Sequence, residues 1–167
     1  MESEEYKEFD GFEVERAITI NKPAEELYRF WRNIENLPRL ITHVRRVTVI
    51  DDKHSHWVAK GPAGTKVEWT SELTRDIPNR VLAWKSIDGD LRNMGSVDFT
   101  PAPGDRGTEV RIMLKYDPPG GRLGAILGKV FGKDPSREIA DGLREFKQLM
   151  ETGEIATING QPSGRVG

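Results

Sequence analysis

Hydrophobic and polar residues alternate over the first two thirds of the chain, and this period of two predicts β-strands. The first strand, residues 13–20, ends at Asn21 and Pro23, where a cap residue and a proline predict a helix over residues 24–33. Pro38 interrupts a second short helical turn over residues 34–41. Six further strands, bounded by turn residues, are predicted at residues 44–51, 54–60, 66–75, 80–87, 94–100 and 108–117.

Beyond the last strand the spacing becomes helical, because Ile139, Leu143, Phe146 and Met150 recur every three or four residues. The order of elements is therefore β-α-α-β6-α. It predicts an α+β fold in which one curved, seven-stranded antiparallel sheet surrounds a long C-terminal helix. We expect an N-terminal extension over residues 1–10, the domain over 11–152, and a flexible tail over 153–167, which is polar and rich in Gly, Pro and Ser.

The inner face of this sheet follows from the parity of each strand. A helix about 10 Å wide cannot fill a strongly curved sheet, so large side chains or a cavity must fill the remainder. Aromatic and small residues alternate on this face, as in a small-molecule site and also as in an ordinary core. The candidate ligand-binding residues are Trp57, Trp69, Ser71, Trp84, Ser86, Val97, Phe99, Ile112, Leu114, Tyr116, Leu127 and Phe131.

Several fragments resemble a known family. They are residues 21–31 (NKPAEELYRFW), 55–60 (SHWVAK), 67–69 (VEW), 116–121 (YDPPGG) and 146–153 (FKQLMETG). They are similar to the START/Bet v 1-like (SRPBCC) superfamily, and within it to the polyketide cyclase/dehydrase group with its coenzyme-Q-binding relatives. The resemblance implies a helix-grip fold with a cavity between the sheet and the C-terminal helix. It also implies a small hydrophobic ligand there, such as a lipid, an isoprenoid quinone or a polyketide-like aromatic.

Catalysis is the alternative use of the same cavity, since a cyclase or dehydratase needs a placed acid or base. Strand parity puts the acidic residues of the sheet on its outer face, which leaves the hydroxyls of Tyr116 and Tyr28 as candidates. A tyrosine with a pKa near 10 can donate a proton but is a poor base. The sequence therefore favours binding over catalysis, with an interaction module without a ligand as a third hypothesis.

Composition and charge argue against several other classes of protein. The chain has 25 Lys and Arg against 27 Asp and Glu, so no cationic excess favours nucleic acid. It has no cysteine, and the pair His54 and His56 lies more than about 20 Å from His43, so we expect no metal and no cofactor. We recognise no signal peptide and no run long enough to span a membrane, and we expect a cytoplasmic protein. The sequence indicates no oligomeric state.

Residues 120–131 are expected to act as a movable gate of the cavity. Gly124, Gly128 and Gly132 recur every four residues, and each interior glycine costs a helix about 0.5–1 kcal/mol relative to alanine. Such a stripe is expected in a segment that bends and opens, or in a short helix that packs tightly. The apolar residues around Leu127 and Phe131 could close the pocket or make a transient contact with a membrane surface.

Overall fold

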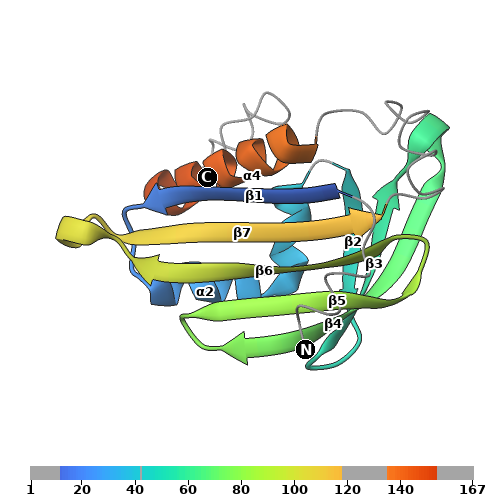
Figure 1. Ribbon diagram of the computed structural model, residues 1–167, viewed down its shortest axis with the longest axis horizontal. Coiled ribbons are helices and arrows are strands. Elements are labelled where there is room, and N and C mark those ends of the chain that lie inside the picture. Colours follow the sequence, from blue (N-terminus) through green and yellow to red (C-terminus); the bar gives the residue numbers. More distant parts are fainter. Residues whose placement is uncertain (1–11, 42, 118–134, 154–167) are drawn as a thin grey trace.

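The computed structural model describes residues 12–41, 43–117 and 135–153 (Figure 1). The predicted extension over residues 1–10 and the predicted gate over 120–131, with Leu127 and Phe131, lie outside the described residues. Of the predicted tail, only Gly153 is described.

The described residues form strands, helices and short 3-10 helices in the predicted order. The elements are β1 (Phe12–Ile20), α2 (Ala24–Arg32), η1 (Ile34–Arg39), β2 (Val44–Val49), β3 (His54–Lys60), η2 (Pro62–Gly64), β4 (Lys66–Ile77), β5 (Val81–Gly89), β6 (Arg92–Pro101), η3 (Pro103–Asp105), β7 (Thr108–Asp117) and α4 (Pro135–Thr152).

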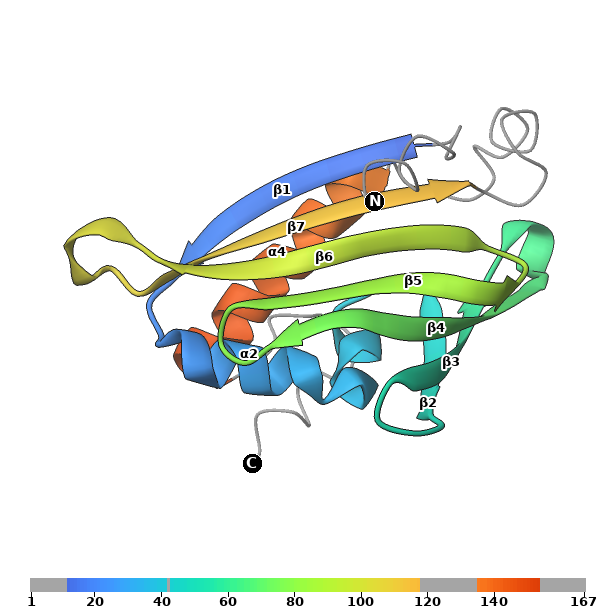
Figure 2. The same cartoon turned by 60° about the horizontal axis from the view of Figure 1, so that its bottom comes forward.

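All seven strands pair in one antiparallel sheet in the order β1-β7-β6-β5-β4-β3-β2. The first strand therefore pairs with the last, and β2 and β1 form the two edges. The sheet curls around α2 and α4, which both lie on its concave side (Figures 1 and 2). The predicted α+β architecture, a curved seven-stranded sheet with a long C-terminal helix, is confirmed.

The start of α2 differs from the prediction. Pro23, not Asn21, precedes the first helical residue, and its carbonyl accepts hydrogen bonds from the backbone N–H groups of Glu26 and Leu27. Asn21 instead donates its backbone N–H to the carboxylate of Glu151 in α4 (2.7 Å). Asn21, the predicted cap of α2, thus links the end of β1 to α4.

The fully buried core lies where α2 and α4 cross the sheet. Phe146 of α4 is 0% exposed and meets Trp31 of α2 edge-on, with ring centroids 5.8 Å apart. Leu27 of α2 and Phe99 of β6 are 0% and 1% exposed. The C-terminal helix, which the sequence analysis places inside the sheet, shares this face with α2 and η1. α2 and the C-terminal part of α4 fill one end of the curved sheet, and η1 lies below the other end, where the site is.

Side chains fix α4 along β1. Lys147 donates to the backbone carbonyl of Thr19 (2.7 Å), and Arg16 donates to the hydroxyl of Ser136 (2.9 Å) at the other end of the helix. The helix ends at Thr152, and Gly153 follows in the left-handed conformation (φ +82°) that terminates many helices. These contacts hold α4 along β1, behind β7 and β6 in the view of Figure 2, and its first turn meets His43, just before β2.

Candidate functional site

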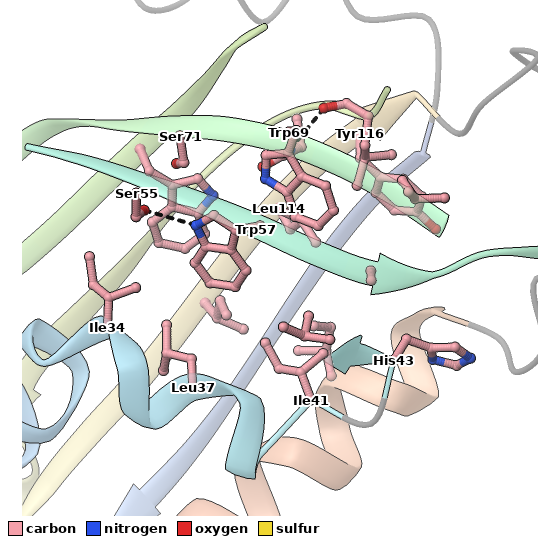
Figure 3. Close-up of a pocket in the computed structure, with 18 of the residues that line it drawn as sticks. Ile34, Leu37, Ile41, His43, Ser55, Trp57, Trp69, Ser71, Leu114 and Tyr116 are labelled. Atoms are coloured by element: carbon pink, nitrogen blue, oxygen red, sulfur yellow. Dashed lines mark hydrogen bonds between the residues drawn. The ribbon is translucent and has the colours of Figure 1, made fainter. Parts of the chain in front are cut away.

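A cavity of about 230 Å³ lies between the inner face of the sheet, η1 and the first turn of α4 (Figure 3). Ile34, Leu37 and Ile41 form its floor, and β3 to β7 form its wall. An apolar cavity of about 150 Å³ already admits benzene, so this one has room for a larger flat molecule. Most of its lining is hydrophobic, and few polar groups reach it.

Two tryptophans form the central part of the wall. Trp57 of β3 and Trp69 of β4 are directly paired across the strands, and their rings stack with centroids 5.8 Å apart at an interplanar angle of 14°. The indole N–H of Trp57 donates to the hydroxyl oxygen of Ser55 (2.9 Å), which holds that ring in place. The pair presents a broad, rigid aromatic surface to the cavity (Figure 3).

Five polar side chains form one row across the inner face, from β7 to β3. Tyr116 is paired with Asn93, whose backbone N–H donates to the hydroxyl of Ser86 (3.0 Å). Ser86 is paired with Ser71, and Ser71 with Ser55. All members of this polar row except Ser86 are more than nine-tenths buried and line the cavity. A stripe of hydroxyl and amide groups therefore crosses an otherwise apolar wall. Ser55 shares the strand parity of Trp57 in β3, and Asn93 shares that of Val97 in β6, so parity could have identified both residues, which the sequence analysis missed.

Three of the predicted ligand-binding residues lie outside the lining. Val97 and Phe99 are 0% and 1% exposed in the core, where α2 covers them; the ring of Phe99 meets Tyr28 edge-on at 6.3 Å. Ser86 instead accepts its hydrogen bond from Asn93 at the end of the β5–β6 ladder. The remaining described candidates line the cavity: Trp57, Trp69, Ser71, Trp84, Ile112, Leu114 and Tyr116.

Tyr28 lies outside the cavity, at the opposite end of the curved sheet. Its hydroxyl donates to the carboxylate of Asp76 (2.5 Å), which also accepts from Arg32 (2.8 Å). Burial, followed by the Asp76 carboxylate, raises the pKa of Tyr28 to about 12. Its hydroxyl is therefore a weaker acid than an ordinary tyrosine. The candidate proton donor from the first helix is a structural link between α2 and β4.

The histidines of β3 face outward, as parity predicts. His54 contacts Asp51 (2.8 Å) and Glu72 (3.7 Å), and His56 contacts Glu68 (2.9 Å) on the same face. In the part of the chain that the structure describes, no group of three or more His, Asp or Glu side chains could hold a metal ion. No helix within that part is long and apolar enough to span a membrane.

A histidine–carboxylate contact that the sequence analysis missed lies in the cavity wall. His43, just before β2, contacts the carboxylate of Glu138 in the first turn of α4 through Nδ1. Both side chains line the cavity and are 31% and 19% exposed. Lys60 lines the same end, and its backbone N–H donates to the carbonyl of His43 (2.8 Å). Parity could not reveal this pair, because one residue lies in a loop and the other in a helix. The only sequence signal is that Glu138 precedes Ile139, on the apolar face of the helix.

Comparison with known proteins agrees with this architecture. Residues 20–144 match the family described as polyketide cyclase/dehydrase and lipid transport. DR_A0006 from Deinococcus radiodurans is 43% identical, with a TM-score of 0.72 over 85% of this chain and 98% of that one. A START superfamily protein from Mycobacterium smegmatis is 13% identical, with a TM-score of 0.65 over 84% of this chain and 99% of that one, which confirms the helix-grip fold. An uncharacterized 17.2 kDa protein of the melC2-rnhH intergenic region of Streptomyces lincolnensis is 28% identical over 140 residues, 83% of this chain and 89% of that protein.

Proposed function

This chain belongs to the polyketide cyclase/dehydrase and lipid transport family, and we propose that it binds a small, flat hydrophobic ligand in the cavity under β3 to β7. The observation that carries the proposal is an apolar cavity of about 230 Å³ with a stacked tryptophan pair in its wall. Small-molecule sites are typically apolar clefts with a few placed polar groups, which here include Ser55, Ser71, Asn93 and Tyr116 of the polar row. A ring system would bury its faces against Trp57 and Trp69 and its edges against η1.

A cavity-filling substitution tests this proposal. Ala59 is 8% exposed on the inner face of β3, lines the cavity and pairs with Val67. In Ala59→Leu the added carbons would occupy space that the ligand needs. Burying them stabilises by about 0.8 kcal/mol per CH₂ where they fit, so the variant should fold. We expect its affinity for anilinonaphthalene sulfonate, measured by fluorescence titration, to fall at least about tenfold.

The matched control is the same substitution on the outer face. Ala83 lies on β5 between Arg75 and Ser96, and it does not line the cavity. Ala83→Leu should bind the probe as the wild type does. Equal affinity of wild type and Ala59→Leu would contradict the proposal, as would equal weakening in the two variants.

An enzymatic step in the same cavity is the second candidate function, and the His43–Glu138 pair favours it. An imidazole beside a carboxylate in a mostly apolar wall is a combination able to move a proton to or from a bound molecule. The family description includes cyclases and dehydrases. Incubation with an aromatic polyketide analogue, followed by mass spectrometry, separates the two functions: loss of water supports the enzyme, and recovery of the unchanged compound supports the carrier.

A further inference from the structure

The cavity has a polar group at each of two ends, with the tryptophan pair between them. Ser55 lies near the start of β3, and Ser71 of β4 is paired with it. Lys60 lies at the other end of β3, next to His43. Lys60 lies five residue steps along β3 from Ser55, which is about 16 Å. Figure 3 shows His43 and the two serines on opposite sides of the Trp57 ring.

The serine end offers hydrogen-bond donors. The hydroxyl oxygen of Ser55 already accepts the indole N–H of Trp57 (2.9 Å), so the O–H of Ser55 remains available as a donor. Ser71 is paired with Ser55 across the strands, is 6% exposed and lines the cavity. An oxygen with lone pairs, such as a ketone or quinone carbonyl, is the ligand group that matches two neighbouring hydroxyls.

The other end offers an acceptor. A carboxylate has about four lone-pair sites, so Glu138 can accept an O–H from a ligand together with its contact to His43. A hydrogen bond to an ionised group is roughly twice as strong as one between neutral groups. Glu138 would repel a ligand carboxylate, and Lys60 is exposed at this end, where solvent screens its charge.

From this placement we propose that the ligand is a flat hydroxyaryl ketone or a close relative, with its carbonyl at Ser55 and Ser71 and its hydroxyl at Glu138. The proposal rests on the proposed function, because it names the ligand class of the same cavity. It goes beyond a hydrophobic ligand by fixing which polar group lies at which end.

Four naphthalene probes test the two ends separately: an acetylnaphthol with its substituents at opposite ends (6-acetyl-2-naphthol), its methyl ether, the matching ethylnaphthol, and the analogue with a carboxylate in place of the hydroxyl. Calorimetry should show that wild-type protein binds the acetylnaphthol about tenfold more tightly than the methyl ether or the ethylnaphthol. The carboxylate analogue should bind more weakly than the acetylnaphthol.

Variants then assign each preference to one end. Glu138→Gln should reduce the preference for hydroxyl over methoxy, because a neutral amide oxygen accepts more weakly than a carboxylate, and should keep the preference for acetyl over ethyl. Ser71→Ala should reduce the preference for acetyl over ethyl, because only the Ser55 hydroxyl then donates, and should keep the preference for hydroxyl over methoxy. Asp141→Asn is the matched control, because Asp141 is on the same helix, contacts Arg144 and does not line the cavity. The control should keep both preferences. A fifth naphthalene, the methyl ether of ethylnaphthol, lacks both groups, so it should bind all variants equally and thereby report that each is folded.

The outcomes separate this inference from the function on which it rests. Equal binding of all the naphthalenes, blocked by Ala59→Leu, would overturn the hydroxyaryl ketone and leave the hydrophobic cavity. Preferences that are unchanged in Glu138→Gln and in Ser71→Ala would do the same, since other groups would then provide them. If no naphthalene binds, the proposed function fails as well.

Discussion

Gly95 sets how closely Trp84 approaches the sheet, and Gly95→Ala tests that packing. Gly95 lies on β6 between Trp84 of β5 and Leu114 of β7, two residues that line the cavity. A methyl group there would lie 2.4 Å from the backbone oxygen of Met113 and 2.9 Å from Cζ2 of Trp84. Because the closer atom belongs to the β7 backbone, a side-chain rotation cannot relieve the contact, and β6 or β7 must shift.

Overpacking of this kind costs about 1–3 kcal/mol. For a domain of this size that corresponds to a fall of roughly 3–10 °C in melting temperature. Urea unfolding should show a lower midpoint with an unchanged slope. Without the clash, Gly95→Ala would raise the stability instead of lowering it, because a strand is less stable with glycine than with alanine by about 0.5–1 kcal/mol. The control is Ser96→Ala, at the next, outward-facing position of β6, which should unfold close to wild type. A Gly95→Ala protein as stable as wild type, or more stable, would refute the packing described for Trp84.

Two further predictions concern the polar links between layers. Spectrophotometric titration of wild type and Tyr28→Phe should differ by one tyrosine that ionises near pH 12, because burial and Asp76 raise the pKa of Tyr28. A difference that titrates near pH 10 would contradict that environment. The Asn21 backbone N–H, followed by Lys147, lowers the pKa of Glu151 below its ordinary value of 4.5. A lowered folded-state pKa gives stability that is present above pH 4.5 and is lost as pH falls through the folded value. Glu151→Gln should therefore destabilise by up to about 1 kcal/mol at neutral pH and by nothing in strong acid; a difference that persists in acid would contradict this.

Strand parity predicted the wall of the cavity because each strand keeps one face toward the helices. It placed Trp57, Trp69 and Tyr116 on the inner face, where the structure has them. It could not predict the β-bulges, each of which shifts the register of a strand by one residue. Ile87 is such an extra residue in β5, opposite the step from Thr70 to Ser71.

A second bulge, at Thr74 of β4, changes what the rest of that strand faces. Leu73 is paired with Trp84 and Arg75 with Ala83, so Asp76 returns to the inner side and meets Tyr28. The same limit applies to Glu138, whose place in the cavity depends on how α4 is anchored along β1. Tertiary contacts of this kind leave no periodic pattern in the sequence, and for that reason the sequence analysis missed Glu138.

The most direct test of the central claim is to locate a bound naphthalene by intermolecular nuclear Overhauser effects. If the cavity is the binding site, ring protons of the probe should show contacts to the indole protons of Trp57 and Trp69 and to the methyl groups of Leu37 and Ile41. Ala59→Leu should abolish these contacts. Contacts confined to the outer face of the sheet, around His54 and His56, would contradict the claim.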